Sequence, residues 1–230
     1  PEIKKRYTTY GMSSQADFHI RDVAFGNQKS GFNIYHHGEK LGHINLNLPG
    51  IHNVYNATAS IAVGVELNIA FDQIKSALEN VEGVQRRLEI KGETNGVIVI
   101  DDYGHHPTEI KVTLKAVEEN WPDRRKVVVF QPHRYSRTRA LFDEFTRAFY
   151  QSDVLVVMPI YAASEKKIEG VNSQNLCERI KAHGHKEVIY ADGFKAARSL
   201  LKQILQPRDV LLTLGAGDVW KVGMEVLKKI

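Results

Sequence analysis

The sequence contains a single cysteine, Cys177, among its 230 residues. One thiol cannot form an internal disulfide, so the sequence excludes a disulfide-stapled secreted scaffold and favours a reducing compartment, for which we expect the cytoplasm. Cys177 lies in a helical pattern of apolar residues, which predicts packing rather than catalysis. No apolar run reaches the roughly 18 residues needed to cross a bilayer, and no signal peptide opens the chain. We therefore expect no membrane partner.

The sequence also lacks blocks of like charge and a G-x-x-x-x-G-K-[ST] phosphate loop. Its net charge is +4, with acids and bases interspersed, so nucleic-acid binding is not indicated and anionic small molecules fit equally well. If this protein uses ATP, the segment that binds the ATP phosphates is not within these 230 residues. Because the chain begins at Pro1 within a charged, strand-like segment, we expect it to be a piece of a longer protein.

The composition is that of a globular protein with a real core, with 43% hydrophobic and 25% charged residues. Alternating apolar and polar residues predict an antiparallel β-meander over residues 16–48, followed by helices from about residue 51 and over 71–80. We assign residues 1–86 to this first domain.

A second pattern, repeated strand then helix, occupies residues 87–230. This alternation predicts an α/β domain with a doubly wound, mostly parallel, Rossmann-like sheet. The predicted strands are 96–101, 126–131, 153–159, 187–191 and 209–214. The predicted helices are 107–120, 137–151, 172–183, 193–205 and 217–229.

Two loops that follow predicted strands concentrate polar side chains. Residues 101–109 read Asp-Asp-Tyr-Gly-His-His-Pro-Thr-Glu, and residues 131–139 read Gln-Pro-His-Arg-Tyr-Ser-Arg-Thr-Arg. Ligands bind at the carboxyl ends of parallel strands, so both loops are expected to face one crevice. The structural alternative is a set of solvated loop residues, with Thr108 as an ordinary helix N-cap.

Two arginines of the second loop, Arg134 and Arg137, are three residues apart around a predicted helix start. The helix dipole disfavours cations there, so we interpret the pair as binding an anionic substrate. A glycine turn at residues 215–218 opens the last helix and can present amides to an anion, but it lacks the spacing of a dinucleotide fingerprint.

A third polar pair, His52 and Asn56, is four residues apart in the first turns of a predicted helix, so both side chains project from one face. The Asn side chain offers the donor and the acceptor needed to read an adenine edge. The alternative is that both residues satisfy free amides at the helix start.

Both loops, together with residues 50–59 (Gly-Ile-His-Asn-Val-Tyr-Asn-Ala-Thr-Ala), resemble the Mur ligases, and the resemblance covers essentially the whole chain. Family members have a UDP-sugar domain, a central ATPase domain and a Rossmann-like C-terminal domain. The resemblance implies that residues 1–86 are the end of the central domain and that residues 87–230 are the complete C-terminal, amino-acid-binding domain. The UDP-sugar domain and the phosphate loop with its magnesium ligands are missing, so the isolated chain is expected to be inactive.

The resemblance further implies an ATP- and Mg²⁺-dependent ligase of peptidoglycan precursor synthesis. Such an enzyme phosphorylates the carboxylate of UDP-N-acetylmuramate, and the amine of L-alanine then attacks the acyl phosphate. Arginine suits these anions because its fork pairs with a carboxylate and stays charged. The implied nucleotide contacts are His52 and Asn56 to adenine, Arg87 to ribose and phosphates, Asp102 to the ribose hydroxyls and Tyr103 near base or ribose. The implied catalytic residues, around the muramate carboxylate and the alanine, are His105, Arg134 and Arg137.

Three other functions remain open from the sequence. The first is a related ligase that recycles a preformed peptide onto muramate. The second is a module that binds a ligand without catalysis. The third is a metal-dependent hydrolase built on Asp101, Asp102, His105 and His106, although adjacent histidines do not readily ligate one ion, and we assign no metal ligands. The sequence does not predict an oligomeric state.

Overall fold

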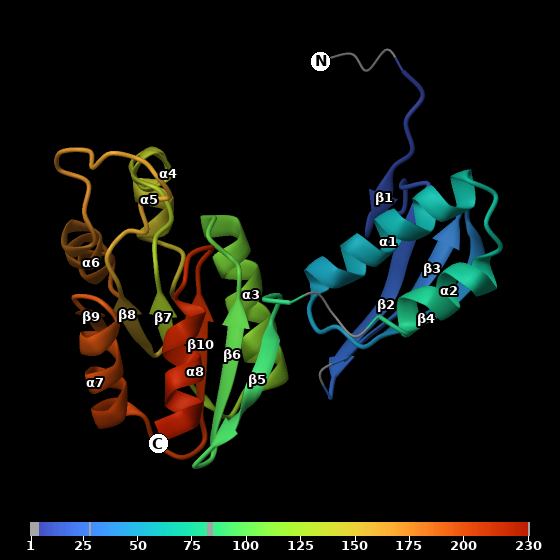
Figure 1. The fold of residues 1–230 in the computed structure, drawn as a ribbon. Helices are drawn as coiled ribbons and strands as arrows, with labels where there is room; N and C mark the ends of the chain where they lie inside the picture. Colours follow the sequence, from blue (N-terminus) through green and yellow to red (C-terminus); the bar gives the residue numbers. More distant parts are fainter. Residues whose placement is uncertain (1–4, 28, 82–84, 230) are drawn as a thin grey trace. The chain divides into compact units, whose positions relative to one another are not determined.

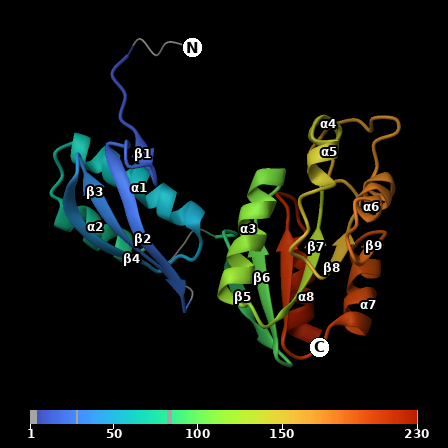
Figure 2. The same cartoon turned by 180° about the vertical axis from the view of Figure 1, so that it is seen from behind.

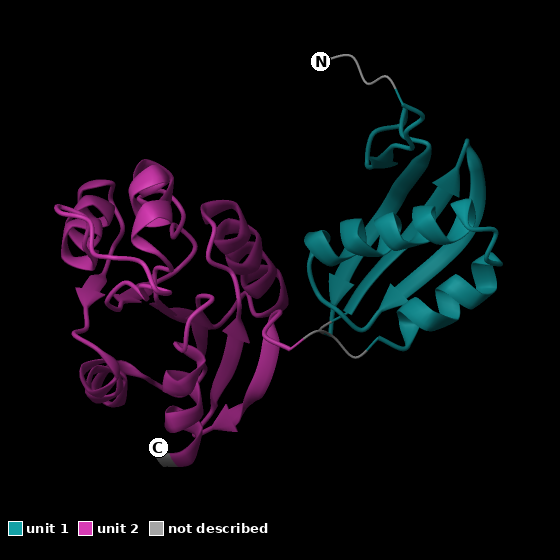
Figure 3. Ribbon diagram, turned by 45° about the horizontal axis from the view of Figure 1, so that its top comes forward, with its two compact units in different colours: residues 1–83 teal, residues 84–230 magenta. Residues whose placement is uncertain are grey.

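A computed structural model describes residues 5–27, 29–81 and 85–229 of the chain. The chain divides into two compact units, Pro1–Gly83 and Val84–Ile230, and each is described by itself (Figure 3). The sequence analysis placed the boundary after residue 86, whereas the two units meet between residues 83 and 84. Residues 82–84 fall outside the described residues.

The first unit is a four-stranded sheet covered by two helices (Figure 1). Strands β2, β3 and β4 form an antiparallel meander, and β1 adds a short parallel pairing to β2 that the sequence pattern did not predict. Alternate residues such as Phe32, Ile34 and Ile44 are fully buried and pack against Val54 and Ile61 of the first helix. The elements are β1 (Tyr10–Gly11), β2 (Phe18–Gly26), β3 (Lys29–His36), β4 (Glu39–Leu46), α1 (Ile51–Glu66) and α2 (Phe71–Glu79).

The second unit contains a six-stranded sheet in the order β5-β6-β10-β7-β8-β9. All pairs are parallel except the hairpin of β5 with β6, so the predicted doubly wound α/β fold is confirmed. The strands are β5 (Glu89–Thr94), β6 (Val97–Asp102), β7 (Arg125–Phe130), β8 (Val154–Val157), β9 (Val188–Tyr190) and β10 (Asp209–Leu214). The helices are α3 (Pro107–Asn120), α4 (Tyr135–Ala140), α5 (Phe142–Phe145), α6 (Ser173–Ala182), α7 (Phe194–Ile204) and α8 (Trp220–Lys229).

Helices cover both faces of this sheet, because successive side chains of each buried strand point to opposite faces. Ile100, Val128 and Leu155 pack in the core that contains α3, α5 and α6. Val99 and Val127 pack in the core that contains α7 and α8. Accordingly α8 lies in front of the sheet in Figure 1, whereas α3 lies in front of it in Figure 2.

The helix predicted over residues 137–151 is wrong. α4 begins at Tyr135, breaks at Leu141, and gives way to α5, which ends at Phe145. Thr146, the C-cap of α5, donates its hydroxyl to the carbonyl of Asp143 at 2.6 Å. Such local side-chain bonds compete with continued helix. The apolar residues that suggested a longer helix, including Phe149, still reach the core.

Within this unit, His185 is a buried histidine whose hydrogen bonds require the neutral ring. Its Nδ1 accepts the amide N–H of Glu187 at 3.2 Å, so Nε2 carries the proton and donates to the Ser152 hydroxyl at 2.8 Å. The Ser152 hydroxyl in turn donates to the Phe149 carbonyl. Burial lowers the pKa of His185 below its usual range.

Folding stability should therefore fall as the pH drops below about 6.5, where the unfolded chain takes up a proton that folded His185 resists. We expect the unfolding free energy to fall between pH 7 and 5.5, and part of that fall to depend on His185. Denaturant titrations of the 230-residue chain and of His185→Gln, whose amide can replace the Nε2 donor, measure it. An equal loss in both proteins would assign the pH dependence to other groups.

Candidate active site

The two polar loops of the sequence lie at the carboxyl ends of β6 and β7, and the glycine turn after β10 lies between them in the sheet order. The chain leaves β6 and β7 towards one face of the sheet and leaves β10 towards the other. Such divergence is where open α/β sheets bind ligands. The ring centroids of His105 and His133 are 5.8 Å apart, so the structure brings the two loops together.

Asp102 organises the first loop from inside. Its carboxylate is buried and accepts three bonds, from the Gly104 amide at 2.7 Å, the Leu88 amide at 2.8 Å and the Thr113 hydroxyl at 3.2 Å. Burial raises the pKa of Asp102, and the two amides offset only part of that rise. A carboxylate has about four acceptor positions, so a ribose hydroxyl would have to share this carboxylate with its internal partners.

Asp101 points to a different partner, Arg86, which the sequence did not single out. The Asp101 carboxylate accepts from Arg86 Nε at 2.8 Å and from the Thr213 hydroxyl at 2.6 Å. Arg86 also donates to the carbonyls of Gly217 at 3.0 Å and Gly215 at 2.6 Å. Neither adjacent acid is therefore a free carboxylate, which disfavours the metal-dependent hydrolase.

Arg87 and Tyr103 face outward, unlike their buried neighbours. The Arg87 side chain is 44% exposed, with only a 3.9 Å approach to Glu109. Tyr103 is 36% exposed, and the guanidinium groups of Arg86 and Arg87 lie 5.0 and 5.8 Å from its ring centroid. Both residues predicted to contact a nucleotide are thus open to a ligand, and that role stays a prediction.

His105 lies in the first loop, and the hydrogen bonding of one of its ring nitrogens is fixed. Its Nδ1 is 3.1 Å from the carbonyl of Tyr103, which can only accept, so Nδ1 carries a proton, and in the neutral ring Nε2 is then an acceptor. The Tyr103 ring meets the imidazole edge to face, at 5.4 Å and 90°. This tautomer leaves Nε2 able to orient an amine or take up its proton.

The residue after it, His106, starts α3. His106 is the N-cap, with Nδ1 accepting the Thr108 amide at 3.2 Å and Glu109 closing a capping box, so the suggestion that Thr108 is the N-cap is wrong. Burial alone would raise the pKa of Glu109, but the amides of His105 and His106 bind its carboxylate and the pKa is lowered overall.

The second loop contributes His133, which the sequence analysis did not select. Arg137 donates from Nη1 to His133 Nδ1 at 3.2 Å. On its other side the imidazole stacks on Tyr161, with centroids 5.5 Å apart and planes 8° apart. Burial and then the charge of Arg137 lower the pKa of His133, so the ring stays neutral at pH 7. The available signal was its position, two residues after the first residue that follows the buried strand β7.

Arg134 and Arg137 lie around the start of a helix, as expected, but that helix begins at Tyr135 rather than at Arg137. Arg134 is the N-cap of α4 with φ 71°, and its amide donates to the carbonyl of Tyr161 at 2.8 Å, while its side chain is exposed. Arg137 lies in the last turn of α4, where the helix dipole favours a cation. The dipole argument therefore still applies to Arg134 at the N-cap but not to Arg137, and the substrate role of both arginines stays a prediction. Arg137 contacts His133, whose ring lies 5.8 Å from that of His105, and this contact places it near the first loop.

His52 and Asn56 lie in α1 of the first unit, His52 partly buried and Asn56 exposed. Helix α1 has Gly50 as its N-cap and no side-chain capping bond, which gives no support to the reading of this pair as caps. The other predicted site residues all belong to the second unit.

Among the described residues, His, Cys, Asp and Glu side chains nowhere gather in a group of three or more able to hold a metal ion. None of the helices described combines the length and apolar character that crossing a bilayer requires. Cys177 is buried, and burial raises the pKa of its thiol to about 11, in keeping with the packing role predicted for it.

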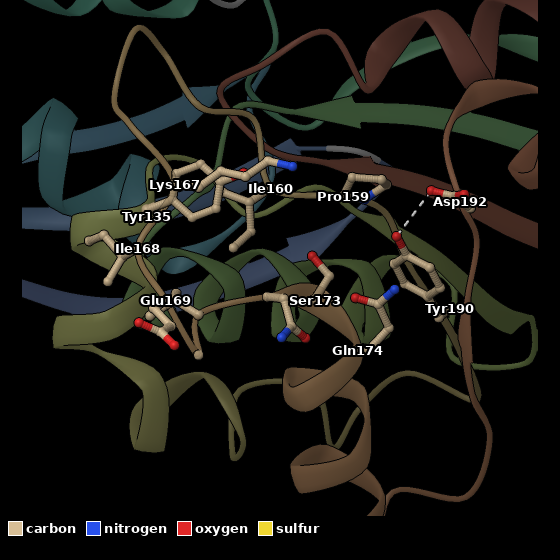
Figure 4. Close-up of a pocket in the computed structure, with 13 residues that line it drawn as sticks. Tyr135, Pro159, Ile160, Lys167, Ile168, Glu169, Ser173, Gln174, Tyr190 and Asp192 are labelled. Atoms are coloured by element: carbon tan, nitrogen blue, oxygen red, sulfur yellow. Dashed lines mark hydrogen bonds between the residues drawn. The ribbon is translucent and has the colours of Figure 1, made fainter.

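A further hollow of about 600 Å³ lies beside the second loop, at the ends of β8 and β9 (Figure 4). Two of its polar side chains already donate hydrogen bonds: Ser173 to the Met158 carbonyl at 2.7 Å and Tyr190 to Asp192 at 3.2 Å. Tyr135, which follows Arg134, lines one side. This hollow was not predicted from the sequence.

Comparison with known proteins defines the class. Residues 86–217 match the Mur ligase, glutamate ligase domain, and residues 1–64 match the Mur ligase middle domain. The first match alone covers more than half of the chain. The chain therefore belongs to the Mur ligase family.

Particular relatives narrow the comparison. The chain is 62% identical over 227 residues to the UDP-N-acetylmuramate–L-alanine ligase of Desulfosudis oleivorans, covering 99% of this chain and 50% of that protein. It is 59% identical over 228 residues to the ligase of the same name from Desulforapulum autotrophicum, with the same two coverages. The crystal structure of UDP-N-acetylmuramate-alanine ligase from Thermotoga maritima superposes with a TM-score of 0.79 at 27% identity, covering 96% of this chain and 47% of that one. The chain thus spans about half the length of the relatives it matches.

Proposed function

We propose that this chain is the C-terminal half of a cytoplasmic, ATP- and Mg²⁺-dependent ligase that joins L-alanine to the carboxylate of UDP-N-acetylmuramate. The observation that carries the proposal is the similarity, over nearly the whole chain, to two proteins named for that reaction. The outward-facing basic and aromatic residues at the carboxyl edge of the sheet support it.

The reaction has two steps that this edge is suited to serve. A carboxylate oxygen of the muramate attacks the γ-phosphorus of ATP and ADP leaves, and the alanine nitrogen then attacks the acyl carbon and phosphate leaves. Negative charge accumulates on the tetrahedral intermediate, where preorganised cations stabilise it most. In our proposal Arg134 and Arg137 supply those cations, and His105 Nε2 orients the amine and accepts its proton.

The nucleotide contacts are assigned residue by residue. Arg87 is assigned to the ribose and phosphates, Tyr103 to the base or ribose, and Asp102 to a ribose hydroxyl through its remaining acceptor position. His52 and Asn56 are assigned to adenine. We assign the ligands of Mg²⁺ to the part of the relatives that this chain does not span.

Two alternative functions differ from the proposed one. The first joins a peptide instead of alanine to the muramate carboxylate, and the second binds a ligand without catalysing a reaction. A peptide-recycling ligase shares the fold, but both relatives of high identity carry the alanine ligase name. A binding module would hold nucleotide or sugar without releasing phosphate. The three possibilities are separable in one assay.

The assay uses the longer protein that contains this chain, with ATP, Mg²⁺ and UDP-N-acetylmuramate, and offers L-alanine or an alanyl tripeptide as the amine. We expect phosphate release with alanine, at least tenfold faster than with the tripeptide, and a product whose mass has gained one alanine residue. Preference for the tripeptide, or binding without phosphate release, would contradict the proposal. The isolated 230-residue chain is the matched control, and without a phosphate loop it should show no turnover.

A further inference from the structure

We propose that Arg86 is a positioning residue that holds the nucleotide-facing loop and the glycine turn after β10 in their working arrangement. The inference rests on the proposed function and adds a residue to it. Arg86 is distinct from its neighbour Arg87, because the Arg86 guanidinium is directed into the protein rather than towards a ligand.

The side chain of Arg86 bridges two strands that are adjacent in the sheet but remote in sequence. Its three nitrogens each have a partner: the carboxylate of Asp101 at the end of β6, and the carbonyls of Gly215 and Gly217 after β10. Asp101 is only 1% exposed. Only the planar fork of arginine can serve these three acceptors at once, whereas a lysine offers one ammonium group.

The backbone around Arg86 is held in an unfavourable conformation. Arg86 and Leu88 have φ values of 60° and 48°, which non-glycine residues seldom adopt. The Asp101 carboxylate accepts a hydrogen bond from the Arg86 side chain, and the Asp102 carboxylate accepts one from the Leu88 amide. Arg87 lies between these two anchored residues, so the adjacent acids fix the residue assigned to the nucleotide.

Arg86 also fixes Tyr103 directly. The Tyr103 amide donates to the Arg86 carbonyl at 2.7 Å, and the Arg86 guanidinium lies 5.0 Å from the Tyr103 ring centroid. Loss of the side-chain anchor would therefore release both nucleotide-facing residues, Arg87 and Tyr103, together.

The glycine turn links Arg86 to the second loop. A Cβ at Gly217 would lie 2.5 Å from Gln131 Oε1 and 2.9 Å from Tyr161 Cγ, so the turn packs directly against both residues. Tyr161 stacks on His133, whose Nδ1 accepts from Arg137. A displacement of the glycine turn would therefore move Tyr161 and His133, and through His133 the Arg137 side chain that is assigned to the substrate.

The test compares Arg86→Lys with Arg125→Lys in the longer protein. Arg125 is a matched control, because it makes the same kind of contacts at the opposite end of the sheet, to buried Asp209 at 2.7 and 3.0 Å and to the Ile204 carbonyl at 2.6 Å. Both variants should lower the unfolding midpoint. At a temperature where both are folded, Arg86→Lys should lower kcat/KM for ATP and alanine roughly 10- to 100-fold, since small misplacements of binding groups cost rates of that order. Arg125→Lys should stay within about threefold of wild type.

A spectroscopic arm keeps the inference separate from the proposed function. In ¹⁵N-labelled 230-residue chain, Arg86→Lys should shift the amide resonances of Tyr103, Gly217 and Tyr161, and Arg125→Lys should leave them in place. A wild-type protein that does not ligate alanine would refute the proposed function. Equal kinetics for the two variants, or unshifted resonances in Arg86→Lys, would refute the role of Arg86.

Discussion

Replacing Arg137 with alanine in the longer protein is expected to lower kcat/KM for alanine and for UDP-N-acetylmuramate by roughly 30- to 1000-fold. Removing one charge-assisted contact to the developing anion costs about 2–4 kcal/mol of transition-state stabilisation. The same range is expected for Arg134→Ala. ATP affinity should change little, because the nucleotide is assigned to other residues, among them Arg87, which precedes β5, and Tyr103, which follows β6.

A neighbouring arginine supplies the control for this prediction. Arg139 lies in the same last turn of α4 and is exposed, so Arg139→Ala removes an equal charge from the same helix. That variant should retain nearly normal kinetics. Arg137→Ala should lose some folding stability, because Arg137 donates to His133 and lies at the favourable end of the helix. Normal kinetics for alanine and the sugar nucleotide in both Arg134→Ala and Arg137→Ala would remove this loop from the substrate site.

The sheet could be predicted from the sequence because its signals are local. Each buried strand is a short β-branched run, and alternation within the run supplies apolar side chains to both faces. Strand β5 was not among the predicted strands, although Asn95-Gly96, both with positive φ values, is a strong two-residue turn signal for its hairpin with β6. The broken helix after β7 was not predicted either, because bonds such as that of Thr146 to Asp143 decide where a helix stops.

The loops of the site could be predicted, but the direction of their side chains could not. Arg86, Leu88 and Arg134 all have positive φ values, and neither arginine nor leucine is a residue type from which a positive φ value is predicted. These turns decide that Arg86 points inward and Arg87 outward. His133 was missed for a related reason, since its role depends on Tyr161, which lies beyond the end of β8 and pairs with His133 through an isolated bridge.

The proposed chemistry predicts where one oxygen atom of the substrate goes. If the muramate carboxylate is phosphorylated before the amine attacks, one carboxylate oxygen becomes the bridging oxygen of the acyl phosphate. That oxygen leaves with the released phosphate, and the other carboxylate oxygen stays in the new amide. The basic residues at the carboxyl edge of the second unit suit a carboxylate that becomes an acyl phosphate and then an oxyanion. A ligase that instead transferred AMP to the carboxylate would leave that oxygen in AMP.

The decisive measurement therefore uses UDP-N-acetylmuramate with both carboxylate oxygens labelled with ¹⁸O, together with the longer protein, ATP, Mg²⁺ and L-alanine. Mass analysis of the released phosphate should find one ¹⁸O atom per molecule, and the alanyl product should keep one. Unlabelled phosphate, or label recovered in AMP, would contradict an acyl phosphate route and with it the function proposed for this chain.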